Sequence, residues 1–250
     1  MKKIQFALLL FILFSFVSCS KQVYTADIDT SYYHISSRHK TDNDIDKMIA
    51  PYKEELDSKM DVVIAYNKEK MPKARPSSTL GNWFSDVLLE EANRIYQSDI
   101  DFATQNYGGI RIPSLKQGDI TIGNIFELMP FDNQLVVLTL DGPTTQQLLD
   151  RIAQLGGWPI SSSLSFTIDN EKATNIMING VAFDPSKEYK VAIADYIANG
   201  GDKCFFLDNA KREDHDLLIR DLIINYLKSK PTNERTIIAD PTPRISTYKM

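Results

Sequence analysis

A glycine-rich loop contains the first residues whose types and spacing could bind a ligand. In "NYGGIR", Asn106, Gly108, Gly109 and Arg111 directly follow a strand-like run. Glycine lets bare backbone approach a ligand, so that N–H groups can donate to its oxygens. The planar guanidinium of an arginine matches phosphate or carboxylate. The pattern predicts a loop that binds an anion, although taken alone it also fits a plain hairpin turn.

Two aromatic residues lie near glycine turns. Phe131 follows a proline in "MPFDN", and Tyr196 stands six residues before Asp202 in "DYIANGGD", beside a second glycine pair. Two such side chains can clamp a flat ring, a contact worth about 1–3 kcal/mol per stacked base. Ordinary core aromatics next to turns are the alternative interpretation.

The sequence contains no recognisable catalytic machinery of its own. The three histidines, His34, His39 and His215, form no HxH, HxxH or HExxH pair, and neither a GxSxG nor a GxxxxGK[ST] motif occurs. The "EDHD" run at 213–216 resembles a ligand cluster, but we interpret it as the acidic first turn of the last helix. We therefore expect neither a metal nor another cofactor in this chain.

Alternating strand and helix patterns must position these residues. Helical periodicity predicts helices over 44–60, with Pro51 in an early turn, over about 123–129, and from Pro143 to the glycines at 156 and 157. Another helix begins near Ser77, Ser78 or Thr79, any of which can cap it, and a closing helix covers 214–229. Strands are predicted over the following ranges: 61–66, 99–104, 134–140, 164–169, 173–180 and 189–197, with one more in the tail. The fold class is therefore α/β (α+β), with mixed β-sheets and helices packed on the outside.

Composition limits the possible partners. The 250 residues are 43% hydrophobic with a net charge of −5, enough apolar material for one domain, which we place at 46–250. A protein that binds a nucleic-acid backbone would need a basic face, so we expect no nucleic acid.

The N-terminus predicts export. "MKK" precedes an apolar stretch of about 14 residues that ends in "FVSC"; this is shorter than a membrane span of about 20 residues and is typical of a signal peptide. "FVSC" resembles the lipobox of bacterial lipoproteins. We predict a signal peptide over 1–18, lipidation of Cys19, a polar tether over 19–45, and a lipid-anchored protein of the bacterial cell envelope, on its periplasmic or surface side. Cys204 would then have no disulfide partner.

Four ordered segments together resemble one family. "STLGNWFSDVL", "NYGGIR", "GDITIGNIFELMPFDNQLVVLTLDG" and "YKVAIADYIANGGD" resemble, in that order, motifs of the C-terminal, nucleotide-binding domain of the 5′-nucleotidases, the family that includes UDP-sugar hydrolases and ecto-5′-nucleotidases. The four segments run from about residue 73 to 206, and the general layout extends from about 45 to 245.

The resemblance implies a role for each site residue. Phe131 and Tyr196 would stack on a nucleobase, and Asn133 and Asp202 would contact base or ribose. Phosphate or substrate recognition would fall to Arg111, on a loop shaped by these residues: Asn106, Gly108 and Gly109. Arg75, just ahead of "LGN", stands near a substrate-binding arginine of the family.

The sequence also departs from the family pattern. Tyr107 replaces a glycine and is expected to narrow the pocket, while Tyr196 replaces the usual phenylalanine and can still stack. An acidic residue is common where Ser77 or Ser78 stands, and Lys203 follows "GGD" in place of glycine.

A larger departure concerns catalysis. Family enzymes carry an N-terminal metallophosphatase domain with two metal ions, but no "GNHD"-like or "GHxH"-like segment occurs here. The resemblance therefore implies the substrate-binding half of a split phosphoesterase, with two divalent metals held by a separate metallophosphatase chain. A non-catalytic lipoprotein that captures nucleotides or nucleosides is the alternative, and a retained fold whose pocket has drifted is a third.

Overall fold

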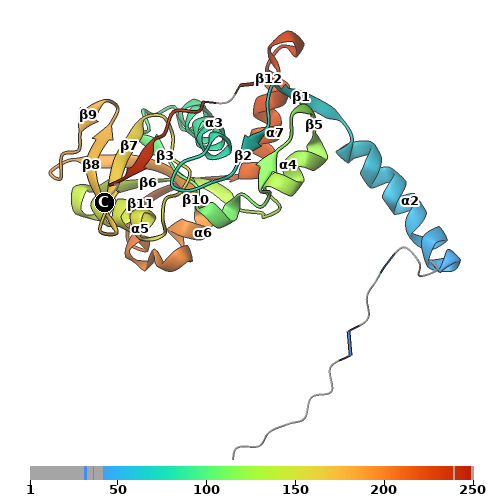
Figure 1. Cartoon of the computed structure of the whole chain (residues 1–250), viewed down its shortest axis with the longest axis horizontal. Coiled ribbons are helices and arrows are strands. Elements are labelled where there is room, and N and C mark those ends of the chain that lie inside the picture. The colour runs from blue at the N-terminus through green and yellow to red at the C-terminus, as the bar shows by residue number, and fades with distance from the viewer. Residues whose placement is uncertain (1–30, 33–35, 37–41, 239, 249–250) are drawn as a thin grey trace, which may run out of the picture. The chain divides into compact units, whose positions relative to one another are not determined.

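The computed structural model describes residues 31–32, 36, 42–238 and 240–248 (Figure 1). The predicted signal peptide, Cys19 and most of the tether lie outside these residues. The chain divides into two compact units, Met1–Met48 and Ile49–Met250, and all the sheets belong to the second unit.

Helices and strands alternate irregularly along the described chain. The α-helices are α2 (Asn43–Met60), α3 (Thr79–Tyr96), α4 (Ile122–Leu128), α5 (Gly142–Gln154), α6 (Asp195–Ala198) and α7 (Ile219–Ser229). Four short 3₁₀ turns are η1 (Tyr107–Gly109), η2 (Gly201–Lys203), η3 (Phe205–Leu207) and η4 (Thr232–Glu234). The strands are β1 (Val63–Asn67), β2 (Met71–Pro72), β3 (Phe102–Ala103), β4 (Ser114–Leu115), β5 (Gly118–Thr121), β6 (Gln134–Asp141), β7 (Leu164–Asp169), β8 (Lys172–Ile178), β9 (Val181–Ala182), β10 (Glu188–Ala194), β11 (Lys211–Leu218), β12 (Thr236–Ile237) and β13 (Ile245–Thr247).

A central sheet in the order β11-β6-β10-β3 separates two apolar cores. Along β6, Leu135 and Val137 enter one core, while Val136 and Leu138 enter the other. Successive side chains of a strand point to opposite faces, so continuous apolar runs in β6 and β10 mean that both faces are covered. Helices α3 and α7 contribute to the first core, and α5 with strands β7 and β8 to the second (Figure 1).

The smaller sheets complete the fold. Their strand orders are β13-β7-β8-β9, β12-β1-β5 and β2-β4, with mixed parallel and antiparallel pairing in the first two. The predicted α/β class with mixed sheets and outer helices is therefore confirmed.

Local signals fix the helix starts. The Ser78 side chain accepts a hydrogen bond from the Gly81 N–H at 3.2 Å, so Ser78 is the cap among the three candidates. Asp141 caps α5 in the same way, through the Thr144 N–H at 2.8 Å. These caps define where the chain enters a helix on either side of the central sheet.

Three sequence-based expectations are wrong. The "EDHD" residues belong to strand β11, because this segment pairs with β6, and helix α7 begins only at Ile219. Helix α2 begins at Asn43, so Pro51 lies inside the helix and not in an early turn. The tail forms two strands, β12 and β13, where one was expected.

No helix in the described part of the chain combines the length and apolarity that a membrane crossing requires.

Candidate functional site

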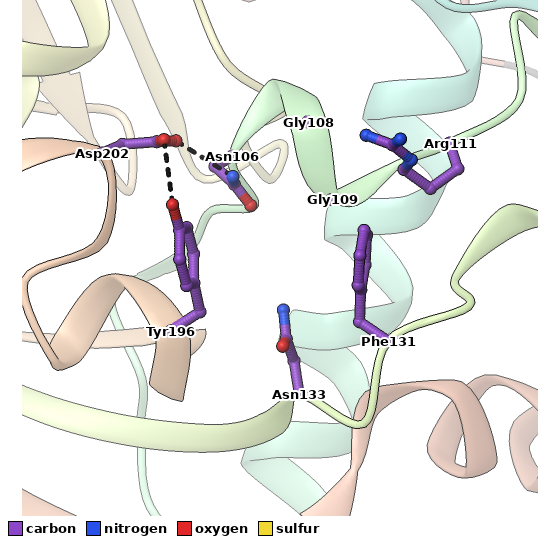
Figure 2. Close-up of a pocket in the computed structure, with 8 residues that line it drawn as sticks. All are labelled: Asn106, Gly108, Gly109, Arg111, Phe131, Asn133, Tyr196 and Asp202. Atoms are coloured by element: carbon purple, nitrogen blue, oxygen red, sulfur yellow. Dashed lines mark hydrogen bonds between the residues drawn. The ribbon is translucent and has the colours of Figure 1, made fainter.

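Eight residues from three separate segments, 106–111, 131–133 and 196–202, surround one pocket of about 300 Å³ (Figure 2). They are Asn106, Gly108, Gly109, Arg111, Phe131, Asn133, Tyr196 and Asp202. The volume lies at the lower end of the range for small-molecule sites, roughly 300–1,000 Å³. The structure thus gathers eight of the nine sequence-predicted substrate-binding residues, and their individual roles in binding stay predictions.

The central sheet positions the two aromatic rings. Strand β6 begins where its antiparallel partner β10 ends, with Leu135 opposite Ala194. Phe131 lies just before β6 and Tyr196 just after β10, so both side chains reach the same edge of the sheet. The rings stand on opposite sides of the pocket (Figure 2), and they are 38% and 45% exposed respectively. Exposed rings separated by an open space can accept a flat ligand between them.

Gly109 is required by packing behind the loop. A Cβ at position 109 would overlap Nε2 of the buried Gln105 and lie 2.8 Å from Oδ1 of Asn106. At Gly108, by contrast, a Cβ would meet nothing closer than Nδ2 of Asn106 at 3.6 Å. Gly108 is the exposed member of the pair, so its backbone is open to solvent where it lines the pocket.

The second glycine pair shapes the other side of the pocket. Gly200 adopts φ +87°, a left-handed conformation that favours glycine. At Gly201 a Cβ would overlap the Tyr196 carbonyl oxygen and lie 2.6 Å from Cε1 of the Tyr196 ring. The absence of a side chain at 201 therefore makes room for the ring of Tyr196.

A chain of hydrogen bonds links the two sides. Gln105 Nε2 donates to Asn106 Oδ1 at 2.8 Å, and Asn106 Nδ2 donates to Asp202 Oδ2 at 3.0 Å. The other carboxylate oxygen of Asp202 accepts from the Tyr196 hydroxyl at 3.4 Å (Figure 2). Arg151 Nε donates to the Asp202 carbonyl at 2.8 Å. These bonds hold the Asp202 loop against the loop of the first glycine pair.

Two polar side chains in the pocket have hydrogen-bonding capacity to spare. The guanidinium carbon of Arg111 lies 5.4 Å from the centre of the Phe131 ring, and the Arg111 backbone N–H donates to the Leu128 carbonyl at 2.9 Å. Asn133 is anchored through its own carbonyl, which accepts from the Ile219 N–H at 2.9 Å. Neither the Arg111 guanidinium nor the Asn133 amide forms a hydrogen bond with another described side chain or backbone group. Both groups are therefore available to a ligand.

Arg75 and Tyr107 lie outside the pocket lining. The guanidinium carbon of Arg75 is 4.1 Å from the centre of the Tyr107 ring, and Lys73 Nζ is also 4.1 Å from that centre. The expectation that Tyr107 narrows the pocket is wrong, because its ring turns toward these cations and the second core. Lys73 and Gln105 also contact this loop, and neither belongs to a sequence motif that predicts such a contact.

The described residues do not build a metal site. Nowhere among them do three or more His, Cys, Asp or Glu side chains come together closely enough to hold an ion. His215, considered above as a ligand, instead packs edge-on against Tyr96 with ring centres 4.3 Å apart.

Comparison with known proteins gives a consistent result. The family model for the 5′-nucleotidase C-terminal domain matches residues 59–208. The chain is 34% identical over 122 residues to Protein UshA of Salmonella pullorum, an alignment that covers 47% of this chain and 22% of that protein. It is 28% identical over 166 residues to the 5′-nucleotidase of Vibrio parahaemolyticus, covering 62% of this chain and 28% of the relative.

Structural comparison agrees with the sequence matches. The crystal structure of the 5′-nucleotidase precursor from Thermus thermophilus superposes with a TM-score of 0.70 at 26% identity, covering 82% of this chain and 43% of that one. The chain thus spans less than half the length of these relatives. With more than half of its own residues matched by the family model, the chain belongs to the 5′-nucleotidase C-terminal domain family.

Proposed function

We propose that this chain is the nucleotide-binding half of a split 5′-nucleotidase-type phosphoesterase, with metal-dependent hydrolysis supplied by a separate metallophosphatase chain. One observation carries the proposal. The Phe131 and Tyr196 rings lie on opposite sides of one pocket, with the unpaired guanidinium of Arg111 at its rim. An aromatic clamp next to a cation fits a ligand with a flat ring and an anionic group, and a nucleotide has both.

Each pocket group has a part in holding such a ligand. The base stacks between the two rings, and the Asn133 amide donates to or accepts from its edge. The Asp202 carboxylate accepts hydrogen bonds from ribose hydroxyls, while Asn106 keeps that carboxylate in place. Arg111 pairs with the phosphate, assisted by the exposed backbone at Gly108.

We propose that the partner carries out the metal-dependent step, because of the ligands that the metals require. Two divalent metals need clustered carboxylate and imidazole ligands, and the described residues do not cluster in that way. The matched regions make up only 22% of UshA and 28% of the Vibrio 5′-nucleotidase, so most of each relative lies outside the part shared with this chain. We propose that what the additional length does in those relatives is done here by a second chain.

Reconstitution tests the proposal. A secreted metallophosphatase encoded beside this chain, and lacking this domain, is purified, loaded with Mn²⁺ and assayed for phosphate release from AMP. We expect release only when both chains are present, and Phe131→Ala to abolish most of it. If the two chains neither associate nor release phosphate, the split enzyme is contradicted. AMP binding without turnover would favour the alternative, a non-catalytic nucleotide-capturing protein.

A lipid anchor in the bacterial cell envelope is part of the same proposal, supported by the "FVSC" motif that ends at Cys19. In cells grown with a labelled fatty acid, the full-length chain would take up label and the Cys19→Ser variant would not. An unlabelled wild-type chain would contradict the anchor.

A further inference from the structure

Helix α7 begins beside the segment that carries Phe131. Arg220, in the first turn of this helix, donates from Nη1 to the Phe131 carbonyl at 3.2 Å and to the Met129 carbonyl at 3.4 Å. Its Nη2 donates to Oδ1 of Asp132 at 2.7 Å. Among the described residues, no other group donates to either carbonyl. Arg220 therefore holds the backbone both before and after the Phe131 ring.

The guanidinium of Arg220 is itself fixed. The side chain is only 9% exposed, and its guanidinium carbon lies 4.3 Å from the centre of the Phe126 ring on α4. A guanidinium stacked on an aromatic face has a defined orientation. A positive charge in the first turn is also unfavourable to the dipole of a helix. The contacts with the Phe131 segment, and not the stability of α7, account for an arginine at this position.

The Phe131 ring depends on its backbone for its position. It is 38% exposed and belongs to neither of the two apolar cores formed by the described residues. A ring that is not enclosed by packed side chains is placed by the chain that carries it. Since groups in a binding site must be held within about 0.5 Å of their productive geometry, the support of this segment matters for stacking.

The opposite ring is held by different bonds. Asp195 Oδ1 accepts from the Tyr196 N–H at 2.7 Å and from the Gln134 N–H at 3.0 Å. These bonds tie Tyr196 to the start of β6 without using Arg220. Loss of the Arg220 guanidinium should therefore displace Phe131 relative to Tyr196 and leave the rest of the pocket in place.

We propose that Arg220 is a positioning residue of the aromatic clamp, which sets the place of the Phe131 ring through the backbone that carries it. The inference rests on the proposed nucleotide-binding function and adds to that site a residue that lies outside the pocket lining. Arg220 acts on the base and not on the phosphate, because its donors are used by the Phe131 segment.

Calorimetric titration of adenosine and AMP into the purified chain and its Arg220→Met variant tests this role. We expect both affinities to fall by the same factor, about fivefold or more and no more than in Phe131→Ala, because the two ligands share the stacked base. The variant should fold, since the Asp132 side chain is 80% exposed and its carboxylate stays in water. If it does not fold, Arg220→Lys takes its place, because one ammonium cannot reach both carbonyls and the carboxylate; about threefold weaker binding is then expected.

A double-mutant cycle with Phe131→Ala separates positioning from general loss of structure. If Arg220 acts through the Phe131 ring, its replacement in the Phe131→Ala chain should change either affinity by less than about twofold. A merely structural role would give the same loss with and without the ring.

The matched control lies at the other end of the same helix. Arg235 donates to the Lys228 and Lys230 carbonyls, both at 2.8 Å, so Arg235→Met removes similar bonds and should leave both affinities unchanged.

Four results would overturn the role of Arg220 while nucleotide binding stands. They are unchanged affinities in the Arg220 variant, a larger loss for AMP than for adenosine, an equal loss without the Phe131 ring, and an equal loss in Arg235→Met. If the wild-type chain binds neither adenosine nor AMP, both this inference and the proposed function fail.

Discussion

Asn106 donates a hydrogen bond to the carboxylate of Asp202 at 3.0 Å, although 96 residues separate them in the chain. Each follows a strand of the central sheet, β3 and β10, and these strands pair in parallel. Parallel neighbours end at the same edge, which is why two distant glycine loops meet there. The bond joins two sides of the pocket. Its geometry depends on Gln105, which donates to the Asn106 side chain, and on Gly109, which leaves room for both side chains.

The glycine pair at 108 and 109 offers a matched test of what the loop needs. Gly109→Ala should destabilise the protein by about 1–3 kcal/mol and weaken AMP binding, because the added Cβ overlaps Gln105 and displaces Asn106. Gly108→Ala has room, with its nearest neighbour at 3.6 Å, and should be tolerated. Urea denaturation and AMP titration measure both effects. Equal behaviour of the two variants would mean that the loop is not packed as described.

Gln105 is expected to orient the Asn106 amide. Its Oε1 has no partner, so the bond from Nε2 to Asn106 Oδ1 is what its side-chain amide contributes. Gln105→Met keeps the shape and removes the donor, which should cost about 1–3 kcal/mol of unfolding free energy and weaken AMP binding. Gln117→Met, at an exposed glutamine that bonds the Lys68 carbonyl, is the control and should shift stability by less than about 0.5 kcal/mol. If Gln105→Met changes neither the unfolding free energy nor AMP binding, Gln105 does not orient the Asn106 amide.

Arg244 ties the C-terminal segment to helix α3. It is 5% exposed, and its guanidinium bonds Asp86 at 2.6 Å and Asp240 at 2.7 Å, as well as the Ile160 carbonyl at 2.8 Å. Arg244→Met should lower the free energy of unfolding by about 3 kcal/mol, the low end for a broken buried pair, because both carboxylates reach water.

An exposed ion pair provides the comparison for Arg244. Lys59→Met breaks the pair of Lys59 with Glu55 on α2, where both side chains are exposed, and should change stability by less than about 1 kcal/mol. Equal losses in Arg244→Met and Lys59→Met, measured by urea denaturation, would show that burial of Arg244 adds nothing.

The buried thiol of Cys204 should make the free energy of unfolding fall at alkaline pH. Burial raises the pKa of its thiol from 9.0 to about 11 in the folded protein. Between these values the unfolded chain releases a proton that the folded chain keeps, so stability is fully present below pH 9 and falls as pH rises toward 11. The slope approaches about 1.4 kcal/mol per pH unit.

The measurement is the free energy of unfolding in urea from about pH 8 to about pH 10. Cys204→Ala should show a flatter dependence than the wild-type chain. The range stops there because burial also raises the pKa of Tyr96, from 10.0 to about 12, which adds a similar slope above it. Identical slopes for the two proteins would contradict a buried, protonated thiol.

Much of the fold could be predicted because periodicity and caps are local properties. The strand at 134–140 and the helix after Pro143 agree closely with β6 and α5, and Ser78 is one of the three caps expected. The "EDHD" segment could not be placed in this way. Its polar residues have no strand-like alternation, and only pairing with β6 makes it a strand.

The residues that line the pocket could be predicted from four motifs that stand in family order, but the residues that support them could not. Gln105 donates a hydrogen bond to the Asn106 side chain, and Lys73 donates to a backbone carbonyl of the loop. Neither contact has a sequence motif that predicts it. The direction of the Tyr107 ring also depends on cations that come from a different segment, 32 and 34 residues earlier in the chain, as the positions of Arg75 and Lys73 show.

The most direct test of the central claim is calorimetric titration of AMP into the wild-type chain and into Phe131→Ala, Tyr196→Ala and Tyr66→Ala. Tyr66 is the control, since its ring is 47% exposed and lies outside the pocket. We predict one AMP site per chain, with each clamp variant about 5- to 150-fold weaker and Tyr66→Ala unchanged, because a stacked base contributes about 1–3 kcal/mol. AMP affinity that is unchanged in both Phe131→Ala and Tyr196→Ala, or no AMP binding by the wild-type chain, would contradict the aromatic clamp.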